Sequence, residues 1–402
     1  MDPVKRQYET YPYPERDPAD EAHRLIEGSP SHPVEIDHYL FQGRRDWSQP
    51  FRALVAGGGT GDGLIMLAQK LADIGCPAEI TYIDMSEASR AIAEARAEAR
   101  GLQVNFITGD LLSAPDHGPF DYIDCCGVLH HLPDPDAGFR ALASALSPEG
   151  GMGLMVYAPY GRTGVYPLQA ALGTLFGDDR PADQIEGALA VLDDLPETHP
   201  FNLNPVLGDH QSSRAGLYDL LLHSRDRAYT VPELAAALDQ AELGLVSLLG
   251  RARYDPGRYD FSARFGDRIK ALDPITRLAV GEQLSGDIKT HIAYVAPTAR
   301  AAKAEARPTK PNLVPHLAGV DARALAHHVH QHGGFTAKED GLDIPVGLPK
   351  ASASLIARID GTASLHQIAA GQDWMTFSAV WSPVHKALTG VNLLHYSSGA
   401  RR

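Results

Sequence analysis

Val55-Ala56-Gly57-Gly58-Gly59-Thr60-Gly61-Asp62-Gly63 joins two segments of different character. Five of these nine residues are glycine, an apolar run over 51–56 precedes them, and apolar residues at helical spacing follow over 64–72. This pattern predicts a strand, a tight turn and a helix. Because glycine adopts positive φ and a helix N-terminus presents unpaired N–H groups, such a turn suits a nucleotide-like ligand.

The spacing of the glycines narrows the class of ligand. A dinucleotide-binding turn requires G-x-G-x-x-G, but the third position falls on Asp62 or Leu64 in the two available registers. This mismatch disfavours a nicotinamide dehydrogenase. A phosphate-binding P-loop is excluded because no Gly-Lys-Ser/Thr follows. The pattern that does fit is G-x-G-x-G, formed by Gly57, Gly59 and Gly61.

Strands and helices alternate over residues 50–157, which is typical of a parallel α/β sheet. A helical insertion over 158–228 interrupts this alternation, and two further strands follow it. We therefore expect a Rossmann-like sheet of seven strands. The predicted strands cover residues 52–56, 79–83, 104–108, 120–125, 152–157, 245–249 and 291–295, and the turn Pro148–Gly151 is expected to separate the fifth strand from the helix before it.

Polar residues follow three of these strands. Asp84 ends the second strand, where its carboxylate can accept hydrogen bonds from both ribose hydroxyls. Asp110 follows the third strand. The fourth strand leads into Phe120-Asp121-Tyr122-Ile123-Asp124-Cys125-Cys126-Gly127-Val128-Leu129-His130-His131-Leu132. In other settings Asp84 and Asp110 would be ordinary turn or capping residues.

Together, the G-x-G-T-G-D pattern and an F-D pair followed after a short gap by L-H-H-L resemble class I S-adenosylmethionine (SAM) methyltransferases over about residues 45–298. The resemblance implies that the last strand of the sheet runs antiparallel. It also implies that SAM is the cofactor and S-adenosylhomocysteine the product. The implied cofactor residues are Gly57, Gly59 and Gly61 at the methionine part, Asp84 and Met85 at the ribose, Asp110 and Leu111 at the adenine, and Gly127 and Leu129 at the donor end.

His130 and His131 are the candidate catalytic residues. A neutral imidazole suits a general base near pH 7. The competing interpretation is that these rings only pack near the cofactor, because many methyl transfers need little beyond alignment. No metal site is expected, since the sequence implies no third ligand beside the two histidines.

The acceptor side is harder to read from the sequence. Loops at the carboxyl ends of parallel strands build the substrate site of this fold. An N-terminal arm over residues 1–45 either packs on the surface or forms a lid over the active site. Arg162 and the polar loop around His223 either contact the substrate or have a purely structural role. The candidate substrate-binding residues are Tyr11, Tyr13, Tyr160, Arg162 and His223.

The flanks indicate further units. Residues 299–314, rich in charge and proline, are expected to be a linker, and residues 315–402 a small helical or winged-helix-like domain. The arm and the segment Ile359–Thr362 weakly resemble bacterial methyltransferases with a C-terminal regulatory domain, some of which methylate protein lysines. The methyltransferase domain is then expected over residues 46–298.

Composition sets the outer limits. The net charge of −14 argues against a nucleic-acid partner. Three cysteines give no disulfide framework, and neither a signal core nor a membrane span is evident, so a cytoplasmic protein is expected. The predicted function is methyl transfer from SAM to an N, O or S acceptor, either a protein side chain such as lysine or a small molecule. The alternative is a SAM-binding regulatory protein without turnover, and a homodimer stays open.

Overall fold

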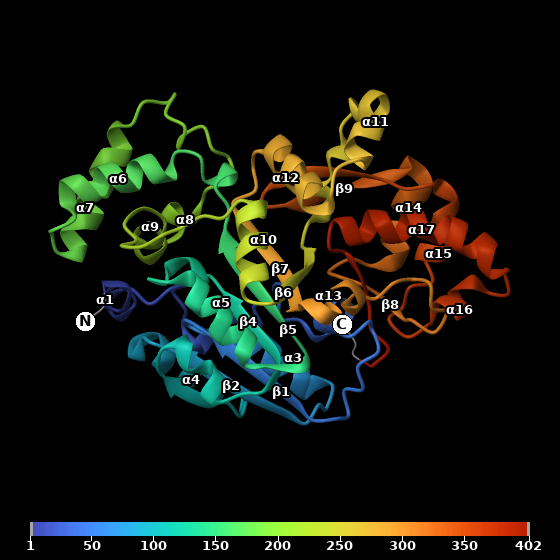
Figure 1. The fold of residues 1–402 in the computed structure, drawn as a ribbon, viewed down its shortest axis with the longest axis horizontal. Helices are drawn as coiled ribbons and strands as arrows, with labels where there is room; N and C mark the ends of the chain where they lie inside the picture. The colour runs from blue at the N-terminus through green and yellow to red at the C-terminus, as the bar shows by residue number, and fades with distance from the viewer. Residues whose placement is uncertain (1–2, 400–402) are drawn as a thin grey trace.

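The computed structural model describes residues 3–399, so residues 1–2 of the predicted arm and 400–402 of the predicted C-terminal unit lie outside it. Its centre is one seven-stranded sheet in the order β3-β2-β1-β4-β5-β7-β6 (Figure 1). β7 is antiparallel to both of its neighbours, and the other pairings are parallel, which confirms the predicted sheet. The strands are β1 Phe51–Ala56, β2 Ala78–Asp84, β3 Asn105–Thr108, β4 Phe120–Cys126, β5 Leu146–Tyr157, β6 Leu243–Leu248 and β7 Thr290–Pro297.

Two apolar layers cover the two faces of the sheet. Alternate residues of β1 supply them: Leu54 and Ala56 belong to one core, and Ala53 and Val55 to the other. The first core is completed by α5 (Pro135–Ser144), α10 (Val231–Gln240) and α12 (Pro274–Ser285). The second is completed by α2 (Pro33–Leu40), α3 (Asp62–Asp73), α4 (Glu87–Ala99) and α13 (Thr298–Ala304).

Two predicted boundaries were wrong. β5 already begins at Leu146, so Pro148–Gly151 lies inside the strand and not in a turn before it. Gly151 is needed there because a Cβ would lie 2.6 Å from the Leu40 side chain. The predicted linker 299–314 begins within α13, where alanines 301 and 304 are buried against the sheet. Short alanine-rich segments of this kind form helices when one face can be buried.

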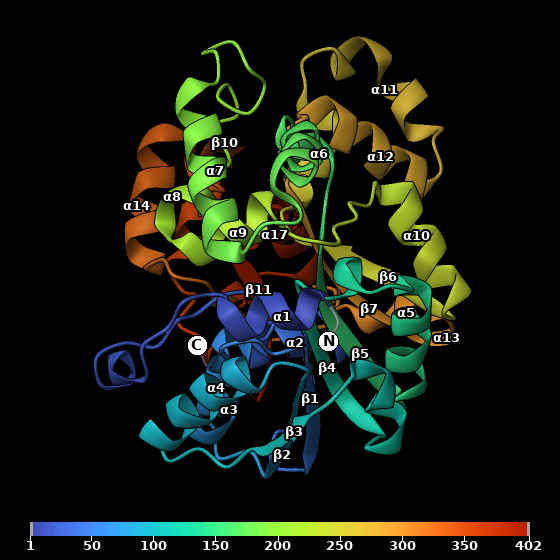
Figure 2. The same cartoon turned by 90° about the vertical axis from the view of Figure 1, so that its left-hand side faces the viewer.

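The insertion after β5 is a helical layer with its own apolar core. It contains α6 (Val165–Phe176), α7 (Pro181–Asp194), α8 (Asp209–Ser212) and α9 (Arg214–Leu221), within the predicted helical insertion 158–228. In Figure 2, the N-terminal helix α1 (Pro3–Thr10) lies between this layer and the sheet domain. Helices α1 and α9 therefore stand over the carboxyl ends of the strands.

The C-terminal residues form a separate unit beside the sheet (Figure 1). A β-hairpin of β9 and β10 follows its first helix, and Ser364 caps α16 in a capping box with Gln367. Its elements are β8 Pro315–Leu317, α14 Ala322–His332, β9 Gly334–Glu339, β10 Leu342–Gly347, α15 Ala353–Ile356, α16 Leu365–Ala369, α17 Trp374–Gly390 and β11 Leu394–Tyr396; α11 Ser262–Lys270 lies before it in the chain.

Helix α2 connects this unit to the sheet domain through buried polar contacts. The Ser397 hydroxyl donates to Oδ2 of Asp37 at 2.6 Å, and the backbone N–H of Tyr396 donates to Nδ1 of His38 at 3.2 Å. Asn392 donates to the buried carboxylate of Glu35 at 3.3 Å. Burial raises the pKa of Asp37 to about 7, because the ionised carboxylate loses its hydration.

This shift predicts a pH-dependent stability. Asp37 has a pKa of about 7 when folded and about 3.9 when unfolded, so the folded chain holds the proton more tightly. The free energy of unfolding should therefore fall as pH rises from about 4 to 7, by up to about 4 kcal/mol. Urea titrations across this range should show a flatter profile for Asp37→Asn. An unchanged slope in this variant would contradict the assignment to Asp37.

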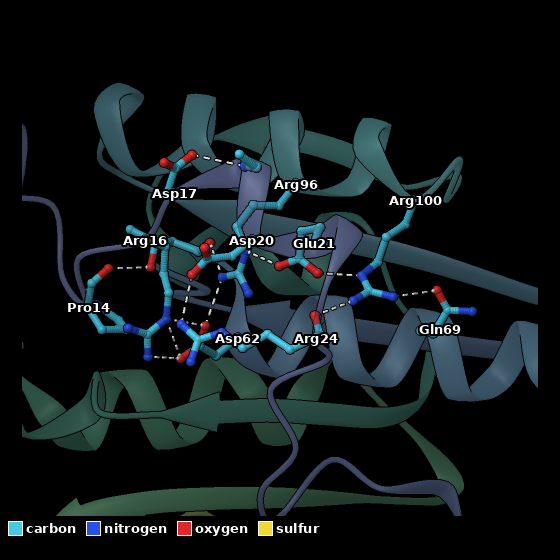
Figure 3. Close-up of polar contacts among 12 residues, drawn as sticks. Pro14, Arg16, Asp17, Asp20, Glu21, Arg24, Asp62, Gln69, Arg96 and Arg100 are labelled. Atoms are coloured by element: carbon cyan, nitrogen blue, oxygen red, sulfur yellow. Dashed lines mark hydrogen bonds and ion pairs between the residues drawn. The ribbon is translucent and has the colours of Figure 1, made fainter.

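A charged network fastens the N-terminal arm to α3 and α4 (Figure 3). The Arg96 guanidinium, 1% exposed, lies 2.7 Å from Glu21 of the 3-10 helix Pro18–Ala22 and 2.7 Å from Asp62 at the start of α3. Arg100 makes a second ion pair with Glu21, and Arg16 meets Asp62 at 2.6 Å. The arm is thereby held against the helix that begins at the glycine turn.

Removing the buried carboxylate tests this fastening. Glu21→Ala leaves the Arg96 guanidinium buried with only part of its charge compensated, and we expect a loss of about 3 kcal/mol in the free energy of unfolding. Asp20→Ala, which breaks the exposed pair with Arg24, is the matched control and should cost less than about 0.5 kcal/mol. Equal effects of the two substitutions in urea unfolding would show that the network does not stabilise the fold.

Candidate active site

A cavity of about 500 Å³ opens at the carboxyl ends of β1, β2, β4 and β5. Its floor is the glycine turn, and α1 and the insertion contribute the opposite walls through Tyr8 and Asp219. Ligands of open α/β sheets bind at this edge. The size is that of a site for a small molecule or cofactor.

The glycine turn forms a close backbone cradle. Gly57 (φ 69°) has no room for a side chain, since a Cβ would lie 2.4 Å from Val128. Gly59 (φ 52°) lies beneath the Tyr13 carbonyl, which a Cβ would approach to 3.0 Å. Both line the cavity, whereas Gly61 caps α3 with φ 100° and faces Ala93. Gly61 therefore shapes the turn from behind.

Asp84 joins this turn to the end of β2. Its Oδ2 accepts the Gly59 N–H at 2.8 Å, its Oδ1 accepts the Ser86 N–H at 2.8 Å, and burial raises its pKa. Met85 lines the cavity beside it. Asp110 caps the 3-10 helix Leu111–Asp116 by accepting the Leu112 N–H at 2.9 Å, and both Asp110 and Leu111 face the same cavity. The predicted ribose and adenine residues thus share one wall.

A buried carboxylate not predicted as a site residue also faces this cavity. Asp124 on β4 pairs in register with Val55 of the glycine-turn strand and accepts a hydrogen bond from the Ser31 hydroxyl. Burial raises its pKa. The signal in the sequence was an acidic residue in the middle of the strand, flanked by the apolar residues Ile123 and Cys125. Its position suits a cationic group of a ligand, such as the ammonium of a methionine moiety.

Of the residues predicted to lie near the methyl-donor end of the cofactor, some line the cavity and others lie in the core. Gly127 lines the cavity, whereas Leu129 is fully buried in the core. His130 is also fully buried outside the cavity lining, and neither ring nitrogen has a hydrogen-bond partner within residues 3–399. Burial holds the pKa of His130 well below its ordinary value. His130 therefore behaves as a neutral packing residue.

His131 has the opposite setting, because it faces the cavity. Its Nδ1 lies 2.7 Å from the Arg225 carbonyl oxygen, so Nδ1 carries the proton and donates it. This tautomer leaves the lone pair on Nε2. Burial lowers the pKa of His131, and the nearby Asp219 carboxylate acts in the opposite direction.

Asp219 lies at the centre of a buried polar group. The Tyr8 hydroxyl donates to its Oδ1 at 3.0 Å, and the Tyr157 hydroxyl donates to its Oδ2 at 2.9 Å. Nε2 of His223 lies 3.3 Å from the same Tyr8 oxygen. Nδ1 of His223 accepts the Arg225 N–H at 3.1 Å, so its proton is on Nε2 and points to Tyr8. Each of these hydrogen bonds has a consistent donor and acceptor.

His131, Asp219 and His223 also place potential metal-ligand atoms within 4.8 Å of one another. The two imidazole rings are stacked, with centroids 3.7 Å apart and planes at 16°. A single ion cannot lie in the planes of two parallel rings at this separation, and the His223 tautomer presents a proton instead of a lone pair. In this conformation the cluster is organised by hydrogen bonds.

The predicted substrate residues lie in different places. Tyr13 and Arg162 line the cavity, but the Arg162 guanidinium is already 2.8 Å from Asp226 and stacks 3.8 Å over the Tyr157 ring. Tyr11 packs on Tyr218 instead, with ring centroids 5.5 Å apart, and Tyr160 lies outside the lining. His223 contributes to a neighbouring cavity. The residues that sequence reasoning missed are Tyr8, Asp124 and Asp219.

Comparison with known proteins supports a methyltransferase domain in this chain. Residues 54–152 match the model of a methyltransferase domain. A protein of Synechococcus sp. described as uncharacterized is 31% identical over 257 residues, covering 60% of this chain and 59% of that protein. A ubiquinone biosynthesis O-methyltransferase of Stutzerimonas stutzeri is 34% identical over 99 residues, 21% of this chain and 43% of that enzyme. The chain thus spans about half the length of the curated relatives it matches.

Solved structures agree on the fold. PKMT2 from Rickettsia typhi superposes with a TM-score of 0.67 at 12% identity, covering 94% of this chain and 77% of that one. The same protein in complex with AdoHcy gives a TM-score of 0.59 at 13% identity, covering 92% and 76%. The match extends through the insertion and the C-terminal unit. Within residues 3–399, no helix combines the length and apolar character needed to cross a bilayer.

Asp84 provides a direct test of ligand binding. Asp84→Asn removes the charge and one of two strong acceptors, so we expect S-adenosylhomocysteine to bind about 10- to 100-fold more weakly. Isothermal titration measures the effect, and circular dichroism checks that the turn still folds. Asp73→Asn at the exposed end of α3 is the control and should bind normally. Unchanged affinity in Asp84→Asn would remove Asp84 from the site.

Proposed function

We propose that this chain, which contains a class I SAM-dependent methyltransferase domain, transfers the methyl group of SAM to a nucleophilic acceptor bound beneath α1 and α9. The observation that carries the proposal is one cavity that joins the glycine cradle and Asp84 on one wall to His131 and Asp219 on another. Gly57, Gly59, Asp84, Asp110 and Asp124 would hold the cofactor. SAM supplies an electrophilic methyl group on a sulfonium when bound.

An amine nitrogen is the acceptor that the charges favour. The described lining carries six carboxylates and three cationic side chains. All three cations are engaged: Arg162 with Asp226 at 2.8 Å, Lys289 with the Val206 carbonyl at 3.1 Å, and Arg225 with the His131 carbonyl at 3.3 Å. Tyr8, Tyr13 and Tyr157 add aromatic faces that attract cations. A lysine side chain or a small amine fits this setting better than an anionic acceptor.

His131 is positioned to take the proton that the acceptor loses. His131 lines the cavity, and its Nδ1–H donates to the Arg225 carbonyl. The Nε2 lone pair is therefore the one that can accept the proton. The imidazolium that forms is stabilised by the Asp219 carboxylate. His130 serves only as packing beneath it. Alignment of acceptor and donor supplies the rest of the rate.

The N-terminal arm would act as a lid in this reaction. Val4, Tyr8 and Tyr13 cover the cavity from the arm side. The Glu9 carboxylate anchors α1 by accepting the Glu87 and Ala88 N–H groups at the start of α4, at 2.7 and 3.2 Å. Closure of this kind excludes water from the reacting groups.

Substitution of the base separates chemistry from binding. His131→Gln should lower kcat about 100-fold while leaving S-adenosylhomocysteine affinity within about twofold. Burial lowers the pKa of His131, so the ring of the wild-type enzyme stays neutral at pH values somewhat below the ordinary histidine pKa. The wild-type enzyme should therefore stay active at those pH values. His366→Gln at the exposed start of α16 is the matched control. A kcat unaffected by His131→Gln would leave alignment as the sole source of rate.

Turnover itself is tested with methyl-labelled SAM and cell extract, followed by separation of protein and small-molecule fractions. Label in either fraction supports the proposal and identifies the acceptor class, which lysine-specific digestion or mass spectrometry then resolves. S-adenosylhomocysteine binding without label in any fraction would favour a regulatory SAM-binding protein. Absence of SAM binding by the folded chain would contradict the proposal.

A further inference from the structure

A second cavity of about 360 Å³ lies behind α1, between this helix and helices α6, α7 and α9 of the insertion. We propose that this second cavity binds the uncharged, hydrogen-bond-donating body of the methyl acceptor, whose reacting amine extends past Tyr8 and His223 into the cofactor cavity. The inference rests on the proposed methyl transfer and assigns a site to the part of the acceptor that does not react.

Helix α1 is the partition between the two cavities. Val4 and Tyr8, one helical turn apart, face the cofactor cavity, whereas Pro3 and Gln7, also one turn apart, face the second one. Helix α9 and the residues after it also contribute side chains to both cavities. Asp219 contributes to the first lining, and Tyr218, Leu221 and Leu222 contribute to the second.

Side chains alone close the gap between α1 and α9 at this point. The Tyr8 hydroxyl meets Asp219 at 3.0 Å and His223 at 3.3 Å. His223 lines the second cavity while its ring stacks on His131 of the first. Because these contacts are made by side chains, the proposal requires the Tyr8 side chain to rotate, so that the amine can pass between the two cavities. The incoming amine would then take the place of the Tyr8 hydroxyl beside Asp219.

Gln7 places an unsatisfied polar group at the wall of the second cavity. This side chain is 4% exposed and lines the cavity, yet its Oε1 has no hydrogen-bond partner among residues 3–399. A buried amide oxygen without a donor is costly, and native structures rarely leave one. An N–H or O–H group of a ligand would satisfy it.

The other polar groups of the cavity indicate that the ligand body is uncharged. Gln169 already donates to the Leu220 carbonyl at 2.9 Å, and Gln184 accepts the Tyr218 hydroxyl at 2.7 Å. Burial holds the pKa of His223 well below its ordinary value, so this ring is neutral. The charged residues of the lining, Arg6 and Asp179, are exposed at the rim. A charged body would therefore find no buried counter-charge.

Gly173 of α6 allows the cavity to be filled without a clash. It lines the second cavity, and a Cβ at this position would meet nothing within 4 Å. Gly173→Phe therefore places an aromatic ring at the lining of the cavity, where it narrows the space for a ligand. Gly266 in α11 is equally open and lies outside both linings, so Gly266→Phe is the matched control. Gln7→Leu removes the unpaired acceptor at similar volume.

The probe is N-acetyl-lysine-N-methylamide, which carries two amide N–H donors and one primary amine. Its binding to the chain saturated with S-adenosylhomocysteine is measured by isothermal titration or NMR. Gly173→Phe should weaken probe binding at least about 10-fold, and Gln7→Leu several-fold, with S-adenosylhomocysteine affinity unchanged in both. Gly266→Phe should match the wild type for both ligands.

Two results would overturn the inference: wild-type probe affinity in Gly173→Phe, or no probe binding to the wild type at about 10 mM while S-adenosylhomocysteine binds. Failure of S-adenosylhomocysteine itself to bind would count against the methyltransferase proposal instead. The two failures are therefore distinguishable within one set of titrations.

Discussion

The hydrogen bond from the Gly59 N–H to the Asp84 carboxylate, 2.8 Å long, fixes the turn on which the site depends. It ties the loop after β1 to the end of β2, and the second oxygen of Asp84 holds the start of the loop before α4 through Ser86. This turn also sets where α3 begins. Asp62, at the start of α3, forms ion pairs with Arg16 and Arg96. The Asp84 carboxylate therefore holds two loops in place, and through them it influences the position of the N-terminal arm.

Most of the sheet was predictable because its strands and helices differ in hydrophobic period and the glycines punctuate them. The cofactor wall followed from strand ends, which the topology brings to one edge. The opposite wall was not predictable in this way. Tyr8 and Asp219 face the cavity together only through contacts between segments far apart in the chain, 211 positions in their case. No local pattern encodes such a contact.

The errors in element boundaries have the same origin. Pro148–Gly151 reads locally as a turn, but β5 continues through it because Gly151 fits beneath Leu40. The predicted linker begins at residue 299, yet burial of two alanines makes residues 298–304 the helix α13. Helix α1 is short and polar, and its contacts with α4 and Asp219 stabilise it. In each case tertiary packing overrides a weak local preference.

Because α1 forms a wall of both cavities, a movement of this helix changes the shape of both. A ligand that moves this helix from one side alters the free energy of binding on the other side, and thermodynamic linkage makes the effect equal in both directions. Cofactor affinity and acceptor affinity are then properties of one shared element. A two-turn helix held by Glu9 and Tyr8 would thus make the binding of the two substrates cooperative, without any change in the sheet beneath it.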